Sequence, residues 1–332
     1  MVSTATNQTL VPPPGPASPQ ASELAVITVT FHPDLERLGR QIDALPPDAW
    51  LVVIDNASAP GIHQELLQRL ARRPKTHLIE NNSNEGLAKA LNRGADYAST
   101  HIDSTQYLLL MDQDSVPFPN AIERLLAAHA ALEKRGVAVG CVGPRLIDKG
   151  TGLQHGFHRI KGWRWFRVYP TEEDRTPVSC SNLNGSGTLL KAELFRKLGG
   201  LDETFFIDHV DTEWAFHVLA SGYLLFGIPD AQFDHAMGER SRRFWCFGWR
   251  IWPQRSPQRH YYLFRNALWL MRRHYVPIVW KVWAAAKLGL TIIVQALVQP
   301  KRGEQLQKML LGAANGIREP TYARVQTPPR KY

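Results

Sequence analysis

The chain has 332 residues, of which 44% are hydrophobic and 21% are charged, and its formal net charge is +9. This composition excludes a disordered chain and supplies enough apolar side chains for one large or two medium domains. The three cysteines, Cys141, Cys180 and Cys246, show neither C-x-x-C spacing nor an even count, so we expect a reducing, cytoplasmic setting without a structural zinc site.

The chain opens with a segment that differs from the rest in composition. Residues 1–22 include the run "TLVPPPGPASPQAS", which is rich in Pro, Ser and Ala and has little to bury. This composition predicts a flexible leader. A secretory signal is not expected, because no charged stretch precedes an apolar core.

Strand and helix patterns then alternate along the chain. β-branched runs predict strands at residues 24–31, 49–58 and 76–80. Helical patterns follow at about 34–45, 61–73 and 87–98, the last after the polar loop "NNSNEG". This alternation predicts an α/β fold built from βαβ units.

The apolar run from Tyr107 to Met111 predicts a further buried strand, which ends in Asp112 and Asp114. A helix is expected after it, because Asn120 can cap a helix and Gly136 can end one. The two acids therefore lie in a strand-to-helix loop, where open α/β sheets bind ligands. They can share a hard cation, or one can hold the cation while the other binds a hydroxyl; an ordinary acidic turn is the alternative.

Other strand ends are also polar. Thr30 and His32 follow the first strand, and Asp55 and Asn56 follow the second. Neither a G-x-G-x-x-G nor a P-loop sequence is present, so glycine-loop nucleotide binding is excluded. A nucleotide can still be held if Asp55 accepts from a base imide, Thr28 or Thr30 contacts base or ribose, and a metal clamps the phosphates.

The excess positive charge lies after residue 235, and residues 241–332 form a basic, aromatic-rich region that we expect to be helical. Within 276–300, Trp280 and Trp283 stand beside Lys281 and Lys287. The uncharged run that follows Lys287 is about a dozen residues, short of the ~20 that cross a bilayer. An interfacial membrane helix and core helices that pack on the first domain both remain open, while nucleic acid is not an expected partner.

Several motifs occur in a familiar order. They are "VITVTFHP", "VVIDNAS", "NNSNEGLAKALNRGADYA", "LLLMDQDS" and "NGSGTLLKAELFRKLGGLDETFFIDHVDTEW". From about Val26 to Gly238 the chain resembles the inverting family-2 glycosyltransferases. Its "DQDS", "FFIDHVDTEW" and "RHYYLFRN" are most similar to bacterial rhamnosyltransferases that use dTDP-L-rhamnose. The resemblance implies a GT-A fold over residues 23–240: a Rossmann-like, nucleotide-sugar-binding mixed sheet with helices on both faces, followed by a C-terminal helical extension.

The resemblance also implies site residues. The donor would be bound by Thr28, Thr30, His32, Asp55, Asn56, Asn84, Gly86, Lys89, Asp112, Gln113 and Gly185. A divalent cation, Mg²⁺ or Mn²⁺, would be held by Asp112, Asp114 and His235. Asp211 would be the catalytic base, with Asp208 as rival because Val210 stands where the family usually has Glu. The diphosphate or the acceptor would meet Glu213, Arg242, Arg243 and Arg265, although a polar helix start and a solvated basic face are alternatives.

The chemistry of inverting transfer needs two separate groups, a base for the acceptor hydroxyl and a stabiliser for the departing nucleotide. The implied function is metal-dependent transfer of L-rhamnose from dTDP-L-rhamnose to a cell-surface polysaccharide or lipid-linked glycan, by a cytoplasmic enzyme peripheral to the inner membrane. One alternative is a hexosyl- or galactofuranosyltransferase that uses a UDP-sugar. Another is a non-enzymatic basic protein that binds nucleic acid or anionic lipid. The sequence leaves the oligomeric state open.

Overall fold

The computed structural model describes residues 19–171, 173–235, 241–245, 249–253, 255–298 and 302–318. Over 241–245 and 249–253 it describes the backbone only. The predicted leader at residues 1–22 therefore lies almost wholly outside the described residues, and so does Cys246. Cys141 and Cys180 are buried and free.

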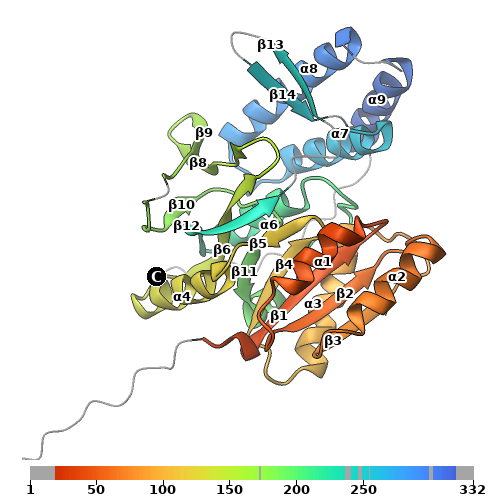
Figure 1. Cartoon of the computed structure of the whole chain (residues 1–332). Coiled ribbons are helices and arrows are strands. Elements are labelled where there is room, and N and C mark those ends of the chain that lie inside the picture. The colour runs from red at the N-terminus through yellow and green to blue at the C-terminus, as the bar shows by residue number, and fades with distance from the viewer. Residues whose placement is uncertain are drawn as a thin grey trace, which may run out of the picture.

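A mixed, ten-stranded sheet forms the centre of the molecule (Figure 1). Its main path runs β10 (Val178–Cys180), β12 (Leu224–His235), β6 (Val139–Asp148), β11 (Thr188–Lys191), β4 (Tyr107–Asp112), β1 (Leu24–Thr30), β2 (Trp50–Asp55) and β3 (Thr76–Glu80). Beside this path, β5 (Ser115–Pro117) pairs with β12 and β7 (Leu153–Gln154) pairs with β6. Strands β4, β1, β2 and β3 are parallel, whereas β11 is antiparallel to both of its neighbours. The predicted α/β class is confirmed.

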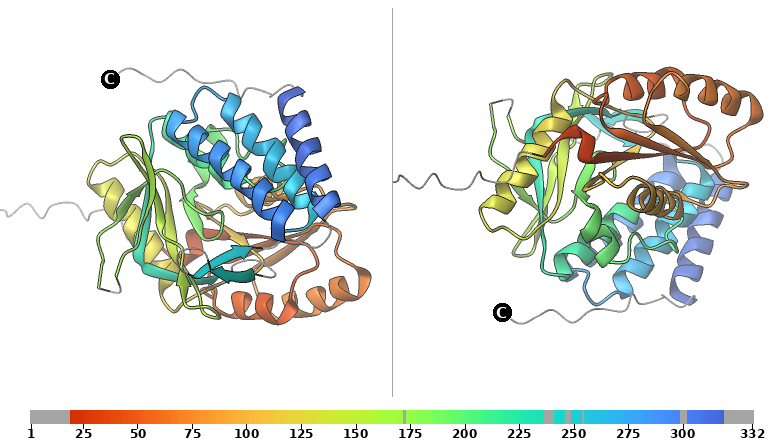
Figure 2. Two further views of the ribbon diagram at one scale, coloured as in Figure 1. Left: turned by 90° about the horizontal axis from the view of Figure 1, so that it is seen from above. Right: turned by 90° about the horizontal axis from the view of Figure 1, so that it is seen from below.

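Helices cover both faces of the sheet, as the view from below in Figure 2 shows. One face carries α1 (Leu35–Asp43), α2 (Pro60–Leu70) and α4 (Ala121–Lys134), and the other carries α3 (Leu87–His101) and α6 (Val210–Ala220); α5 (Ala192–Lys197) follows β11. Successive strand residues point to opposite faces. Thus Ala25 and Ile27 of β1 join the core under α3, while Leu24 and Val26 join the core under α1.

The remaining elements lie beyond the sheet. They are the hairpins β8 (Phe157–Lys161) with β9 (Arg164–Val168) and β13 (Ser241–Trp245) with β14 (Trp249–Pro253), and the helices α7 (Pro257–Arg272), α8 (Ile278–Val298) and α9 (Arg302–Arg318). Figure 2 shows the three helices lying together above the sheet. Trp269 and Trp280 are buried in the same core as α3 and α6. The expected C-terminal helices therefore pack on the first region and share its core.

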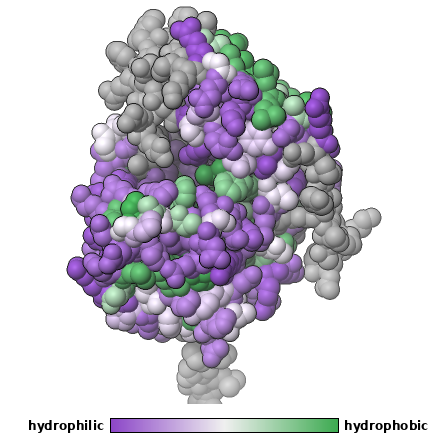
Figure 3. Space-filling view, turned by 90° about the vertical axis from the view of Figure 1, so that its right-hand side faces the viewer, coloured by the Kyte–Doolittle hydropathy of each residue, from purple (hydrophilic) through white to green (hydrophobic). Residues whose placement is uncertain are grey.

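Helix α8 is also the one described helix that is long and apolar enough, by length and composition, to cross a membrane. Only 33% of its segment Ile278–Ala296 is buried. Among its exposed side chains are Ile278, Val282, Leu290 and Ile293. In Figure 3 apolar atoms gather at the top of the molecule, where the C-terminal helices lie, above a mainly hydrophilic face.

Candidate active site

The polar residues predicted at strand ends meet at one edge of the sheet. In the parallel register, Thr30 pairs with Asp55 across β1 and β2, and Val29 pairs with Asp112 across β1 and β4. Parallel strands end on the same side, so Asp55 and Asp112 lie two strands apart along that edge. This is the edge at which open α/β sheets bind ligands.

Two carboxylates and an imidazole converge at the end of β4. Antiparallel pairing of β5 with β12 places Ser115 opposite His235 and so brings His235 to the turn that carries Asp112 and Asp114. One ligand atom from each of Asp112, Asp114 and His235 lies within 4.8 Å of the others. The His235 Nδ1 lies 3.5 Å from Asp114 Oδ1. Carboxylate oxygens and an imidazole nitrogen together suit a divalent cation such as Mn²⁺ or Mg²⁺.

The buried side chain of Gln41 holds the turn between Asp112 and Ser115 in place. Gln41 of α1 donates from Nε2 to the backbone oxygens of Asp112, at 2.7 Å, and Ser115, at 2.6 Å. Its Oε1 accepts from Thr28 Oγ1 at 3.1 Å. Thr28, predicted to contact the donor, is fully buried and therefore supports the turn in this structure.

The site also raises the proton affinity of Asp112. Burial, together with the charges of Asp114 and Asp211, raises the pKa of Asp112 to about 6, although His235 acts against the shift. A carboxyl group in this setting gains from a cation that compensates its charge. The charge of Asp211, the candidate base, is thus one of the causes of this shift.

The two candidate bases have different surroundings. Asp208 precedes α6 with a positive φ of 60° and accepts from Arg259 Nη2 at 2.9 Å and Nε at 3.3 Å. Arg255 Nε lies 3.9 Å from the same carboxylate. In the described part of the chain no cation pairs with Asp211, whose Oδ1 accepts from the Thr212 amide at 2.8 Å, and burial raises its pKa. These surroundings favour Asp211 as the proton acceptor, because Arg259 and Arg255 already compensate the negative charge of Asp208.

The segment 184–187 connects the base to the metal cluster. A Cβ atom at Gly185 would lie 3.7 Å from the Asp211 Cβ, so the backbone there passes beside the base. One residue on, Ser186 Oγ accepts from the Asp112 amide at 3.5 Å. Gly185, which is predicted to bind the sugar donor, thus lies between Asp211 and the metal cluster.

Asp55, predicted to read the nucleotide base, is buried and already bound within the protein. Its Oδ1 accepts from Thr30 Oγ1 at 2.8 Å and Ser58 Oγ at 2.7 Å. Its Oδ2 accepts from the Ser58 amide at 3.1 Å and lies 3.4 Å from His63 Nδ1. Base recognition by Asp55 stays a prediction, and it requires one of these partners to give way.

Two other residues predicted to bind the sugar donor make hydrogen bonds in the loops at this edge of the sheet. The Gln113 side chain binds both backbone groups of Phe31, at 2.8 and 3.3 Å. His32 has a φ of 48° and accepts at Nδ1 from the Ala59 amide at 3.2 Å.

Asn56 and Asn84 hold the loop before α3. Asn56 Nδ2 donates to the Gly86 oxygen at 3.2 Å, and the Gly86 amide donates to Asn84 Oδ1 at 3.0 Å. Gly86 has a φ of 88°, and a Cβ there would meet Phe206 at 2.7 Å, which explains the glycine. Lys89 forms an exposed pair with Glu85 at 3.0 Å.

The residues predicted for the diphosphate or acceptor are placed differently. Glu213 is fully buried and accepts from Arg273 Nη1 at 3.2 Å. Arg265 lies over the Trp269 ring at 4.1 Å and donates to the Thr204 oxygen at 2.9 Å. These contacts favour structural roles for both residues. Arg242 and Arg243 belong to β13, where side chains lie outside the described part.

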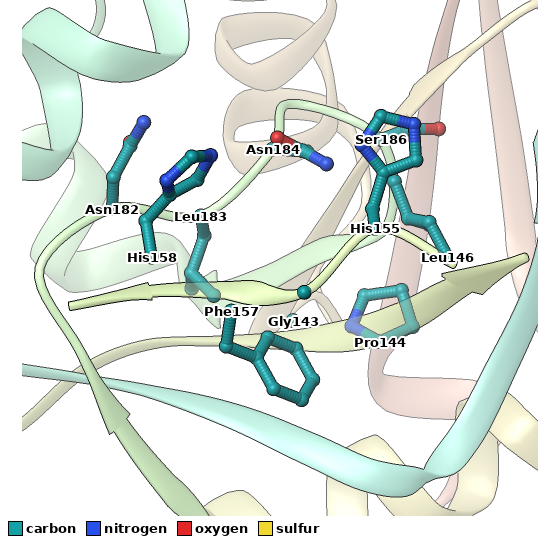
Figure 4. Close-up of a pocket in the computed structure, with 11 residues that line it drawn as sticks. Gly143, Pro144, Leu146, His155, Phe157, His158, Asn182, Leu183, Asn184 and Ser186 are labelled. Atoms are coloured by element: carbon teal, nitrogen blue, oxygen red, sulfur yellow. The ribbon is translucent and has the colours of Figure 1, made fainter. Parts of the chain in front are cut away.

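A small pocket beside the metal cluster contains residues that the sequence did not single out (Figure 4). Its polar lining is His155, His158, Asn182, Asn184 and Ser186. The His155 and His235 rings meet edge to face with centroids 6.0 Å apart. Burial lowers the pKa of His155 to about 4 and that of His158 to about 3, so both rings are neutral at pH 7. Asn184 and Ser186 belong to the motif "NGSGTLLKAELFRKLGGLDETFFIDHVDTEW", but its spacing did not single them out, and His155, His158 and Asn182 stand outside every motif that the sequence offered.

Comparison with known proteins shows which family the chain resembles. The family "Glycosyl transferase family 2" matches residues 34–199. The chain is 32% identical over 300 residues to "dTDP-rhamnosyl transferase RfbF" of Shigella flexneri, covering 90% of this chain and 96% of that protein. It is 25% identical over 238 residues, 64% of this chain and 75% of the other, to "N-acetylglucosaminyl-diphospho-decaprenol L-rhamnosyltransferase" of Mycobacterium tuberculosis.

Solved structures share the fold at low sequence identity. GalNAc-T7 with UDP, GalNAc and Mn²⁺ superposes with a TM-score of 0.55 and 18% identity, over 86% of this chain and 54% of that one. A mannosyltransferase from Pyrobaculum calidifontis with GDP-Man and Mn²⁺ superposes with a TM-score of 0.52 and 18% identity, over 89% and 87% of the two chains. Both likenesses concern the fold.

Proposed function

The chain belongs to glycosyl transferase family 2 and is a glycosyltransferase of the GT-A fold, and we propose that it transfers L-rhamnose from dTDP-L-rhamnose with inversion. The observation that carries the proposal is its likeness to the dTDP-rhamnosyl transferase of Shigella flexneri, which runs almost from end to end of both proteins. Family membership sets aside the non-enzymatic interpretation. A UDP-sugar donor remains the alternative that an assay must test.

In the proposed reaction, two groups of this chain divide the work. Asp211 takes the proton of the acceptor hydroxyl, whose oxygen then attacks the anomeric carbon as the bond to dTDP breaks. Asp112, Asp114 and His235 fit a divalent cation, Mn²⁺ or Mg²⁺, which when bound would supply positive charge for the departing diphosphate. Asp208, held by Arg259, fixes the start of α6 and with it the position of Asp211.

We also propose an acceptor that carries a lipid diphosphate, as the name of the Mycobacterium tuberculosis relative describes for that protein. Cations gather beside the base. Arg255 and Arg259 contact Asp208. Burial and the charges of Arg255 and Arg167 lower the pKa of Lys287, whereas Asp208 and Asp211 act against this shift. In the part of the chain that the structure describes, no carboxylate pairs with Arg167 or Lys287. An anionic acceptor would compensate this charge, and the exposed apolar side of α8 suits a peripheral position at the inner membrane face.

A donor panel tests this function. With Mn²⁺ and a lipid-diphosphate saccharide as acceptor, we expect release of dTDP from dTDP-L-rhamnose, with far slower release from dTDP-glucose, UDP-galactofuranose and UDP-glucose. Faster turnover of a UDP-sugar would show that the enzyme uses the alternative donor. Chelation with EDTA should stop the reaction, and added Mn²⁺ or Mg²⁺ should restore it.

A further inference from the structure

The hairpin of β8 and β9 carries positive charge and no acid. Its sequence from Phe157 to Tyr169, "FHRIKGWRWFRVY", contains neither Asp nor Glu. The two strands pair with each other and form a sheet separate from the central one. Among the described residues, no carboxylate forms an ion pair with the exposed cations of this hairpin, which are Arg159, Lys161, Arg164 and Arg167.

The inner face of the hairpin packs on the protein next to α8. Ile160 and Trp165, which pair across the hairpin, are partly buried against the core. The Trp165 ring lies 6.4 Å from the Phe216 ring, and the Phe216 ring lies 5.7 Å from that of Trp280 in α8. Strand β9 and α8 are in contact, and Figure 1 shows them side by side. The hairpin is therefore a direct neighbour of the helix whose apolar side is exposed.

The outer face of the hairpin brings like charges together. Residues that pair directly across an antiparallel ladder share a face. Lys161 therefore lies beside Arg164, and Arg159 lies beside Phe166, with all four side chains exposed. Cations that stand directly opposite each other repel and destabilise the pair of strands. An anion from outside the chain would compensate this charge.

Exposed aromatic rings accompany these cations. Trp163 in the turn is 77% exposed, Tyr169 is 57% exposed and Phe166 is 37% exposed. Gly162, with a φ of 57°, provides the positive φ of the turn, so the turn itself does not require a Trp. Trp and Tyr concentrate where lipid headgroups meet acyl chains, and Lys and Arg attract anionic headgroups. The hairpin thus combines the two kinds of side chain that a membrane-surface element uses.

We propose that the β8–β9 hairpin binds the headgroups of anionic lipids, with Lys161 and Arg164 at the lipid phosphates and the Trp163 ring in the interface. This inference rests on the proposed function, which places the enzyme at the inner membrane face. The neighbouring apolar side of α8 favours a lipid surface over a nucleic acid, because a nucleic acid has no apolar interior to receive aliphatic side chains. Two membrane contacts also fix the orientation of the molecule, whereas a single helix leaves it free to turn about the helix axis.

Vesicle sedimentation of the full chain tests the hairpin. Lys161→Gln with Arg164→Gln removes two charges and keeps both side chains long. With vesicles of phosphatidylglycerol and phosphatidylcholine at low salt, we expect the partition coefficient to fall roughly 10–30-fold, because each cation near an anionic surface contributes about fivefold. Trp163→Ser should weaken binding severalfold at high salt as well, since salt does not screen the contribution of the ring.

A matched control comes from the end of α4. Lys134 and Arg135 are exposed cations there, so Lys134→Gln with Arg135→Gln makes the same change in net charge away from the hairpin. This control should partition like the parent. Melting temperatures confirm that each variant is folded, and turnover of a short, water-soluble acceptor should be equal in both double variants and the parent.

The outcomes separate the hairpin from the proposed function. If the hairpin variants sediment like the parent, α8 alone binds lipid and the hairpin inference is wrong. Equal losses in both double variants would show an effect of net charge and would also overturn it. If the parent releases dTDP from dTDP-L-rhamnose but stays in the supernatant, the membrane contact is wrong and the donor stands. Hairpin-dependent sedimentation of a parent that uses only UDP-sugars would contradict the donor alone.

A labelled single-stranded oligonucleotide tests the competing partner. Fluorescence anisotropy should show no difference between the parent and the Lys161→Gln, Arg164→Gln variant at physiological salt. Tight oligonucleotide binding that this variant loses, together with a parent that does not sediment with vesicles, would assign the hairpin to nucleic acid and overturn the proposal.

Discussion

Asp112 shows how a candidate metal ligand can oppose the stability of the metal-free fold. Its pKa is raised to about 6 in the folded chain, above the ordinary 3.8, so the folded state binds the proton more tightly than the unfolded state does. By linkage, ionisation of Asp112 destabilises the metal-free fold as pH rises from about 4 to 6, and the cost is fully present above pH 6.

We therefore predict that Asp112→Asn raises the melting temperature of the metal-free protein at pH 8 by a few degrees, the shift that ~1 kcal/mol produces. The same variant should lose the stabilisation that Mn²⁺ gives the parent, because a charged ligand is gone. Differential scanning fluorimetry with EDTA and with Mn²⁺ checks both results. A lower melting temperature in EDTA would show that the carboxylate stabilises the fold without metal.

Asp211 allows a prediction about rate and pH. Asp211→Asn should leave donor affinity nearly intact and reduce kcat by about 10²–10⁴, the usual contribution of a general base. Because burial raises the pKa of Asp211, kcat of the parent should fall with decreasing pH at a pKa above the ordinary carboxyl value of 3.8. Steady-state kinetics across pH test both points. If Asp208→Asn instead loses turnover while Asp211→Asn keeps it, Asp208 is the base.

At the residue scale, what the sequence revealed was local. The D-x-D turn was visible because Asp112 and Asp114 directly follow an apolar run. The full set of contacts around Asp55 was not visible, since Ser58 and His63 reach it only after the chain turns. The pairing of His158 with Asn182 was invisible for the same reason, because it is a bridge between segments far apart in the chain.

At the element scale, regular βαβ units were predictable and irregular pairings were not. The strand expected at 76–80 is β3, and the helix expected at 34–45 contains α1. Local periodicity determines such elements. Strand β11 escaped prediction because it inserts antiparallel between β4 and β6, and β5 because three residues carry no periodicity.

A buried ion network joins α6 to the end of α7. Arg273 is 5% exposed and donates to Asp202 Oδ2 at 2.5 Å and Glu213 Oε1 at 3.2 Å, and Tyr275 donates to the same Glu213 oxygen at 2.6 Å. The network ties the end of α7 to α6, the helix whose first turn carries Asp211, the proposed base.

We predict that Arg273→Met destabilises the fold by ~3–5 kcal/mol, because it leaves two buried carboxylates without their cation. Urea denaturation measures the loss, and Arg318→Met, at an exposed position, is the control with the same change in charge and shape. Equal midpoints for the two variants would mean that the network contributes little.

At the scale of the whole molecule, positive charge and exposed apolar side chains lie in the same region, around Asp208 and α8. Arg255 lies beside Asp208, and the charges of Asp208 and Asp211 act on Lys287 of α8, the helix whose apolar side is exposed. Ile278, Val282, Leu290 and Ile293 fall on one side of α8 at about 100° per residue. A soluble sugar acceptor needs no such surface, whereas a lipid-linked acceptor is held in a membrane.

The last prediction follows from this arrangement. The protein should sediment with vesicles that contain anionic lipid, and less at high salt, because cations and an apolar helix side act together. Val282→Asp with Ile293→Asp should abolish sedimentation yet leave turnover of a short, water-soluble acceptor unchanged, because both side chains are more than half exposed. Ile278→Ser, at an equally exposed site, removes one apolar side chain, and it should weaken vesicle binding less than the double variant does. A parent protein that stays in the supernatant at low salt would show that α8 does not bind lipid, and the acceptor would then reach Asp211 from solution.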